Sequence, residues 1–217
     1  MWLLVYRVLP DAPSANMNAV WGMILDAYAE LSVDSQFGNL LLNLFTNPDK
    51  HNDHYPKLKG KANEIKHLVE PLLRVWIMCC DDANDMHNAV TIVLKHLVAI
   101  INLMDEHAHD AFMSVENAKK LRTRIDDFLI AYTALCTFAD AAGNHLWNVT
   151  PKFHWLWHLG VRAYWLSPRR TACWLDETFV GVVKRIAAKS TRGCALHKVP
   201  RAVMPKYRWG RHADHRF

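Results

Sequence analysis

The sequence predicts an all-α protein, an antiparallel multi-helix bundle that ends in a basic, loosely ordered tail. Apolar residues recur at helical spacing along most of the chain. The 217 residues include only 8 glycines, which disfavours a turn-rich β fold. Loops rich in Asn, Asp and Pro separate the periodic stretches. With 51% apolar and 22% charged residues, the composition is that of a folded globular chain.

The N-terminal part predicts two helices followed by a loop. Residues 2–9 form an apolar stretch that offers the one plausible strand, or otherwise a short helix. Ser14 can cap a helix over 15–32, where apolar residues follow a helical stripe. A second helix is predicted over 36–46. The polar segment 47–60 contains two prolines and predicts a loop or hinge.

Three further helices are predicted in the middle of the chain. Their expected ranges are about 61–82, 84–107 and 115–141. Pro71 is expected to kink the first of them or to start a new segment. Ser114 is placed to cap the third, and Gly143 to stop it.

The C-terminal part predicts two more helices and a tail. One helix begins at Pro151 and ends before Ser167-Pro168. The last helix spans about 173–189, and the tail from about 191 is basic and turn-like. We therefore divide the chain into an acidic helical body, 1–146, and a basic, aromatic-rich region, 147–217, packed on that body.

Charge is distributed very unevenly along the chain. Residues 151–217 carry 14 Lys and Arg against 3 Asp and Glu, a net charge of +11, whereas residues 1–150 carry a net charge of −6. Basic side chains alternate with aromatic rings, as in sequence-tolerant nucleic-acid binding. The predicted nucleic-acid contacts are Arg162, Arg169, Arg170, Lys184, Arg185, Lys189, Arg192, Lys206, Arg208 and Arg211.

Other partners and the location follow from simpler observations. A basic end can instead be solvated, or can dock onto an acidic protein partner. No apolar run approaches the ~20 residues that span a bilayer, so no membrane partner is expected. The five cysteines are odd in number and contain no CxxC pair, which favours reduced thiols and an intracellular location, with the nucleus as one option. A protein partner or an oligomer is left open.

The stretch 174–190 raises a question about two acids in this basic region. Asp176 and Glu177 suit the first turn of a helix, where carboxylates interact favourably with the helix dipole. Gly181 and Lys184 share a face with Glu177, and a glycine inside a helix costs about 1 kcal/mol relative to alanine. The face is therefore either a site beside Glu177 or a close packing contact with another helix.

His154 and His158 stand four residues apart, on one face of the predicted helix from Pro151. This spacing can bind zinc, and Cys173, Cys194 and His197 offer further ligand types. The alternative is that both histidines form hydrogen bonds within an aromatic helix. Two other His- and Asp-rich stretches, 51–54 and 105–110, are interpreted as solvated polar loops or helix ends.

Two segments carry a resemblance to a known family. KFHWLWHL and SPRRTACWLDETFVGVVKRIA resemble the C-terminal part of eukaryotic cut-and-paste transposases of the Kyakuja-Dileera-Zisupton type, and residues 56–73 resemble the helical region upstream. The similarity covers roughly residues 35–210. Such enzymes have an RNase-H-like core with three metal-binding acids, and the resemblance implies that Glu177 corresponds to the third.

The same resemblance limits the predicted chemistry. The other two acids belong on strands that this sequence does not offer, and one carboxylate cannot hold two catalytic ions. The resemblance therefore implies a fragment or relic, and Mg²⁺ only where a complete site exists. We expect a transposase-derived helical protein associated with nucleic acid, without catalysis or stable metal on its own. As part of a longer chain it would belong to a DNA transposase. The alternatives are a structural helical subunit and a zinc-stabilised module.

Overall fold

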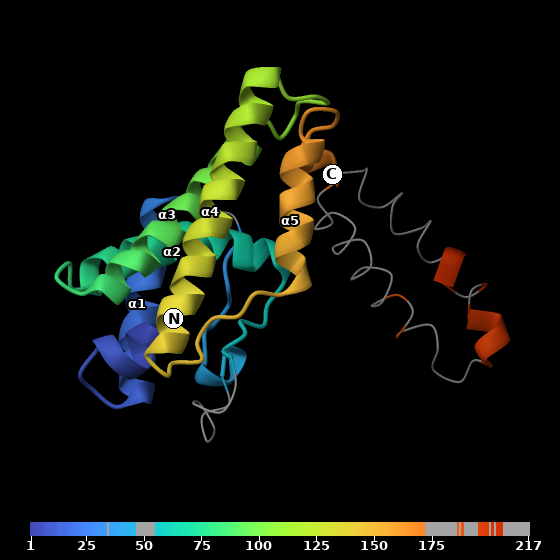
Figure 1. Cartoon of the computed structure of the whole chain (residues 1–217). Helices are drawn as coiled ribbons and strands as arrows, with labels where there is room; N and C mark the ends of the chain where they lie inside the picture. The colour runs from blue at the N-terminus through green and yellow to red at the C-terminus, as the bar shows by residue number, and fades with distance from the viewer. Residues whose placement is uncertain are drawn as a thin grey trace. The chain divides into compact units, whose positions relative to one another are not determined.

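The computed structural model describes residues 1–33, 35–46 and 55–171, and beyond them only 186, 188, 195–199, 201 and 203–205. The chain divides into two compact units, Met1–Thr171 and Ala172–Phe217. Helical residues of the described part alone make up more than half of the 217-residue chain (Figure 1). The described part contains no strand. The predicted all-α class is therefore confirmed.

The first unit is built from long helices joined by loops. Their bounds are α1 (Pro13–Glu30), α2 (Ala62–Cys79), α3 (Asp85–Glu106), α4 (Val115–Ala141) and α5 (Pro151–Arg162). Shorter helical turns in the described part are η1 (Leu4–Val8), η2 (Leu42–Leu44), η4 (Pro168–Thr171) and, in the second unit, η5 (Leu196–Lys198). Each long helix packs against the next one along the chain, and the contact between α3 and α4 is the most extensive.

Three helix ends follow the predicted chemistry, but the predicted Ser14 cap is wrong, because α1 begins at Pro13 with Ala12 as its N-cap. The Ser114 hydroxyl accepts a hydrogen bond from the Asn117 backbone N–H at 3.2 Å, which confirms the predicted cap of α4. Gly143 has a φ of +73°, the left-handed conformation that ends a helix. α5 begins at Pro151 as predicted but ends at Arg162, about one turn before the expected end at Leu166.

α2 excludes one of the two predicted effects of Pro71. The helix continues through Pro71 without interruption, so no new segment starts there. Pro71 is buried, and Leu68 and Val75, one turn to either side, are also buried. We attribute the unbroken helix to this burial, which offsets the backbone hydrogen bond that proline cannot donate.

The core of the first unit consists of two clusters of buried side chains. One joins the N-terminal residues, α1, residues 37–45 and α2, and includes the fully buried Tyr28 and Trp76. The other joins α3, α4 and α5 around Leu121, Ile125 and Phe128. Val90 of α3 packs against both clusters, so α3 connects the two halves of the unit.

The possible strand at residues 2–9 is wrong, because the segment forms helical turns that include η1. The backbone carbonyls of this segment find a hydrogen-bond donor in Asn16, which is only 2% exposed. The Asn16 side-chain amide donates hydrogen bonds to the carbonyl of Val5 at 2.8 Å and to that of Leu9 at 3.1 Å. A polar side chain from the next helix thus provides the donor that a neighbouring strand would have provided.

The predicted helix over 36–46 is also wrong. Apart from the three-residue η2, its described residues are irregular. Phe37, Leu40 and Phe45 are buried at spacings that a helical stripe also allows, but the chain does not form a helix there. The Phe45 carbonyl instead accepts a hydrogen bond from Lys57 N–H at 2.9 Å. The apolar residues of this segment fill the core, and their helix-compatible spacing is not sufficient to form a helix.

Within the described part, α3 is long and apolar enough to cross a membrane by length and composition alone. Core helices of soluble proteins, which are mostly buried, share this property, whereas only 17% of the apolar window is buried here. In this structure α3 packs against α2 and α4 and buries Val93, Ile100 and Leu103.

The environment of Tyr132 leads us to expect that the free energy of unfolding decreases at alkaline pH. Burial raises the pKa of Tyr132 to about 12, above the value of about 10 in an unfolded chain. The hydroxyl donates a hydrogen bond to the Asn148 carbonyl at 3.4 Å. The contribution of Tyr132 to the free energy of unfolding is fully present below pH ~10. It is lost as pH rises towards 12, because the tyrosine hydroxyl ionises at lower pH in the unfolded chain than in the folded one. Urea unfolding at pH values from about 9 to 11.5 should show a steeper alkaline loss for the wild type than for Tyr132→Phe; equal slopes would contradict this.

Candidate nucleic-acid interface on helix α5

One face of α5 packs on α4 through aromatic rings and a glycine. The Phe153 ring lies 4.5 Å from the Tyr132 ring and 6.2 Å from the Phe128 ring, measured between centroids. About two turns later, Gly160 is buried against α4. A Cβ at Gly160 would lie 3.1 Å from Ile125 Cδ1 and 3.2 Å from Arg122 Cδ. This close approach fixes which face of α5 meets the body.

The opposite face therefore points away from α4 and is rich in exposed aromatic rings. Trp155 is 64% exposed, and Trp165, just beyond the helix, is 68% exposed. Arg162 is exposed between them in sequence. A groove of about 300 Å³ lies on this face, lined by Trp155, His158, Leu159, Arg162, Trp165, Leu166 and Pro168.

The two predicted zinc ligands lie on this side of α5 and touch each other. The Nε2 atoms of His154 and His158 are 3.0 Å apart, and their rings meet edge to face with centroids 4.4 Å apart. One ring must donate its Nε2–H to the lone pair of the other, so at most one Nε2 carries a proton in this contact. The hydrogen-bonding alternative is thus present in the structure.

Beside this face, Arg122 of α4 makes a cation–π contact with Trp157 of α5. The guanidinium carbon of Arg122 lies 4.4 Å from the centroid of the Trp157 ring. Arg122 Nε also donates to the Asp126 carboxylate at 2.7 Å. A cation above an aromatic ring contributes about 0.5–1 kcal/mol at exposed sites. Arg122, on α4, therefore orients Trp157 and the α5 side chains beside it.

Of the other predicted nucleic-acid contacts, only Arg169 has a described side chain. Its Nη2 lies 3.4 Å from the Asp105 carboxylate, which also accepts a 2.7 Å hydrogen bond from Lys66 Nζ. Arg169 thus takes part in an ion-pair network of the body, whereas Arg162 lies on the open groove. For Arg170 the structure describes the backbone only.

The remaining predicted residues lie outside the described part of the chain. They include both candidate catalytic acids and most of the basic side chains: Asp176, Glu177, Lys184, Arg185, Lys189, Arg192, Lys206, Arg208 and Arg211. Gly181, Cys173 and Cys194 lie outside it as well. Of the tail, the described residues 196–199, 201 and 203–205 are helical, which corrects the expectation of turns at those positions. Among the residues that the structure describes, no group of three His, Cys, Asp or Glu is placed to hold a metal ion.

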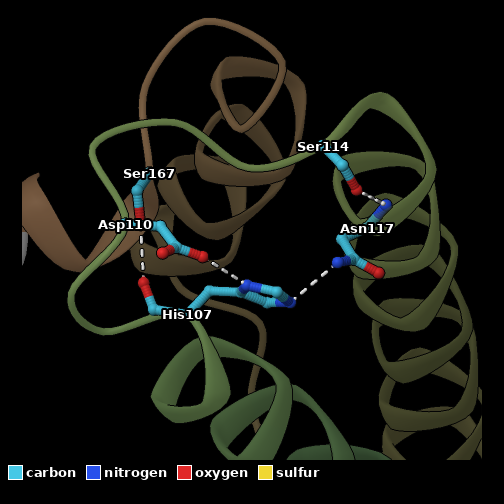
Figure 2. A network of polar contacts seen from close by, with 5 residues as sticks. All are labelled: His107, Asp110, Ser114, Asn117 and Ser167. Carbon is cyan, nitrogen blue, oxygen red and sulfur yellow. Dashed lines mark hydrogen bonds and ion pairs between the residues drawn. The ribbon is translucent and has the colours of Figure 1, made fainter.

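A polar network near the end of α5 was not predicted from the sequence (Figure 2). The interpretation of 105–110 as solvated polar residues is wrong for His107. Its Nδ1 lies 2.7 Å from the Asp110 carboxylate, and its Nε2 lies 2.8 Å from the Asn117 side-chain nitrogen. If Asn117 donates, Nε2 is the acceptor and Nδ1–H donates to Asp110.

Ser167 connects this network to the segment after α5. It is buried, its hydroxyl donates to the His107 carbonyl at 3.4 Å, and its N–H donates to the Ala111 carbonyl at 3.1 Å. Pro168, a lining residue of the groove, follows immediately. The network thus positions one end of the groove. His-x-x-Asp at a helix end was the only local signal, because Asn117 and Ser167 come from other elements.

Comparison with known proteins found no match for this chain. No protein-family model, no curated protein and no solved structure matches it. The resemblance to transposases therefore stays a prediction, and the functional argument depends on the groove and on the charge distribution.

Proposed function

We propose that this chain is a helical protein that associates with single-stranded nucleic acid, with little preference for sequence. One observation supports the proposal most: Trp155, Arg162 and Trp165 lie together, exposed, on one groove of α5. Any base can stack on an aromatic ring, whatever the nucleic-acid sequence, and an arginine can bind the adjacent phosphates. Exposed apolar side chains that lie together on one surface typically mark an interaction site.

The charge of the sequence supports the same proposal. The groove belongs to the segment 151–217, which has a net charge of +11. Lysines and arginines that bind phosphates release counterions, so affinity should fall steeply with salt. A transposase-derived origin would fit such a partner. The proposal gives the chain no catalytic step on its own, and any metal-dependent chemistry at Glu177 would need acids from elsewhere.

A second function is favoured by the lining of the groove. Leu159, Leu166 and Pro168 contribute apolar surface beside the two tryptophans. Such a surface is also typical of a protein interface, which fits a helical subunit that docks onto an acidic protein partner. Binding to an acidic peptide but not to oligonucleotides would favour this alternative.

The test compares binding of labelled single-stranded oligonucleotides to the wild type and to Trp155→Ala, Trp165→Ala and the double variant. Loss of a stacked base costs about 1–3 kcal/mol, which corresponds to a decrease in affinity of about fivefold to 150-fold for each tryptophan. Ile130→Ala is the matched control, because Ile130 is 70% exposed on α4.

Fluorescence anisotropy at salt concentrations from about 50 to 200 mM gives both the affinity and its salt dependence. We expect the control to bind like the wild type and all forms to bind more weakly as salt rises. Equal binding by the wild type and the double variant would reject the groove as the contact surface. Preference for duplex over single strands would reject stacking as the mode of recognition.

A further inference from the structure

We propose that His154 and His158 together form a binding site for a divalent transition-metal ion of the zinc type. This inference does not require the proposed nucleic-acid function, although His158 also lines the tryptophan groove. The two residues are one helical turn apart on α5, and the exposed His154 lets an ion approach from solvent.

The distance between the two nitrogen atoms matches what a metal ion requires. Zinc binds imidazole nitrogen at about 2.0–2.1 Å, so two such ligands at tetrahedral or somewhat smaller angles are about 2.9–3.4 Å apart. The Nε2 atoms of His154 and His158 are 3.0 Å apart without any ion. The two nitrogen atoms thus already lie at the separation that an ion requires, and a rotation of the rings would turn both towards one ion.

The protonation states required are accessible. In the hydrogen bond, one ring carries its proton on Nε2; for metal binding both rings must carry it on Nδ1, so that both Nε2 lone pairs face the ion. Both forms are neutral, and binding by the neutral pair needs only a change of tautomer.

The surroundings restrict how the pair can move. The Trp157 ring stacks against His154, with centroids 6.4 Å apart and planes 8° apart, and meets His158 edge to face at 5.1 Å. Trp157 is itself held by Arg122 of α4. A helix backbone and a fixed aromatic neighbour together reduce the side-chain entropy that two free histidines would lose on binding. Water completes the coordination of a two-ligand site.

The test is calorimetric titration of the full chain with zinc chloride at about pH 7.5, under reducing conditions. The chain has 13 histidines and 5 cysteines, so the decisive quantity is the change in stoichiometry between variants. His154→Gln and His158→Gln should each bind one zinc ion fewer than the wild type, and the double variant should lose no more than either single variant. The matched control is His96→Gln, a histidine of α3 whose neighbours three and four residues away are apolar.

A second measurement uses the neighbouring tryptophan. Cu²⁺ binds nitrogen ligands more tightly than zinc does, and as a paramagnetic ion it quenches nearby indole fluorescence. Quenching of tryptophan fluorescence at low micromolar Cu²⁺ should be weaker in both α5 histidine variants than in His96→Gln. The proposal is overturned if the variants bind as many zinc ions as the wild type. It is equally overturned if His96→Gln loses as much zinc as they do, since the ions would then bind scattered histidines. Circular dichroism confirms that each variant is folded.

Discussion

Trp76→Ala is expected to lower the free energy of unfolding by about 3–5 kcal/mol, the usual cost of removing a large buried aromatic side chain. Trp76 is 2% exposed in the core cluster of α1 and α2. Its indole N–H donates to the Thr91 hydroxyl of α3 at 2.9 Å, and its ring meets that of His87 edge to face at 5.2 Å. Alanine would leave a cavity and remove this hydrogen bond between α2 and α3.

The matched comparison is Trp155→Ala, the same substitution at a ring that is 64% exposed. Surface substitutions usually change stability by no more than about 0.5 kcal/mol. Trp76→Phe, which keeps part of the ring system but cannot donate to Thr91, should lie between the two. Urea unfolding monitored by circular dichroism measures all three. A loss below about 1 kcal/mol for Trp76→Ala, or equal losses at both tryptophans, would contradict the assignment of core and surface.

Gly160→Leu is expected to lower the free energy of unfolding by about 1–3 kcal/mol, the usual cost of inserting extra atoms into a packed interface. The position allows little space, since a Cβ there would lie 3.1 Å from Ile125 Cδ1 and 3.2 Å from Arg122 Cδ. Leucine would therefore push α5 away from α4. Binding to oligonucleotides should fall as well, because α5 would no longer present one defined face.

The control for this variant is Gly22→Leu in α1, where a Cβ would have no atom within 4 Å. Removing a glycine from a helix interior stabilises the helix by about 0.5–1 kcal/mol. The two substitutions should thus shift the urea midpoint in opposite directions. A shift of the same sign and size for both would mean that α5 does not pack on α4 through Gly160.

Predictions from the sequence were accurate where local patterns decide the structure. The helices α1, α3 and α4 begin and end within a few residues of their predicted bounds, because their apolar stripes and end signals are local. The prediction failed at 36–46, where apolar residues fill the core without forming a helix. Nothing local distinguishes these two uses of an apolar run.

The candidate site was predicted only in part. His154, His158 and Arg162 were identified by residue type and spacing, but the sequence alone could not show which face of α5 is exposed. That depends on Gly160 meeting Ile125, a contact between residues far apart in the chain. The network of His107, Asn117 and Ser167 joins three separate elements for the same reason, and no periodicity could have predicted it.

Photochemical crosslinking most directly tests the central claim, that the exposed face of α5 binds single-stranded nucleic acid. A single-stranded oligonucleotide carrying iodouracil would be irradiated with the full chain, and the crosslinked peptides identified by mass spectrometry. Iodouracil reacts preferentially with aromatic rings that stack on it. We expect crosslinks at Trp155 and Trp165, decreasing as salt rises and absent at the buried Trp76. Crosslinks confined to residues 1–146, or none at about 50 mM salt, would contradict the claim.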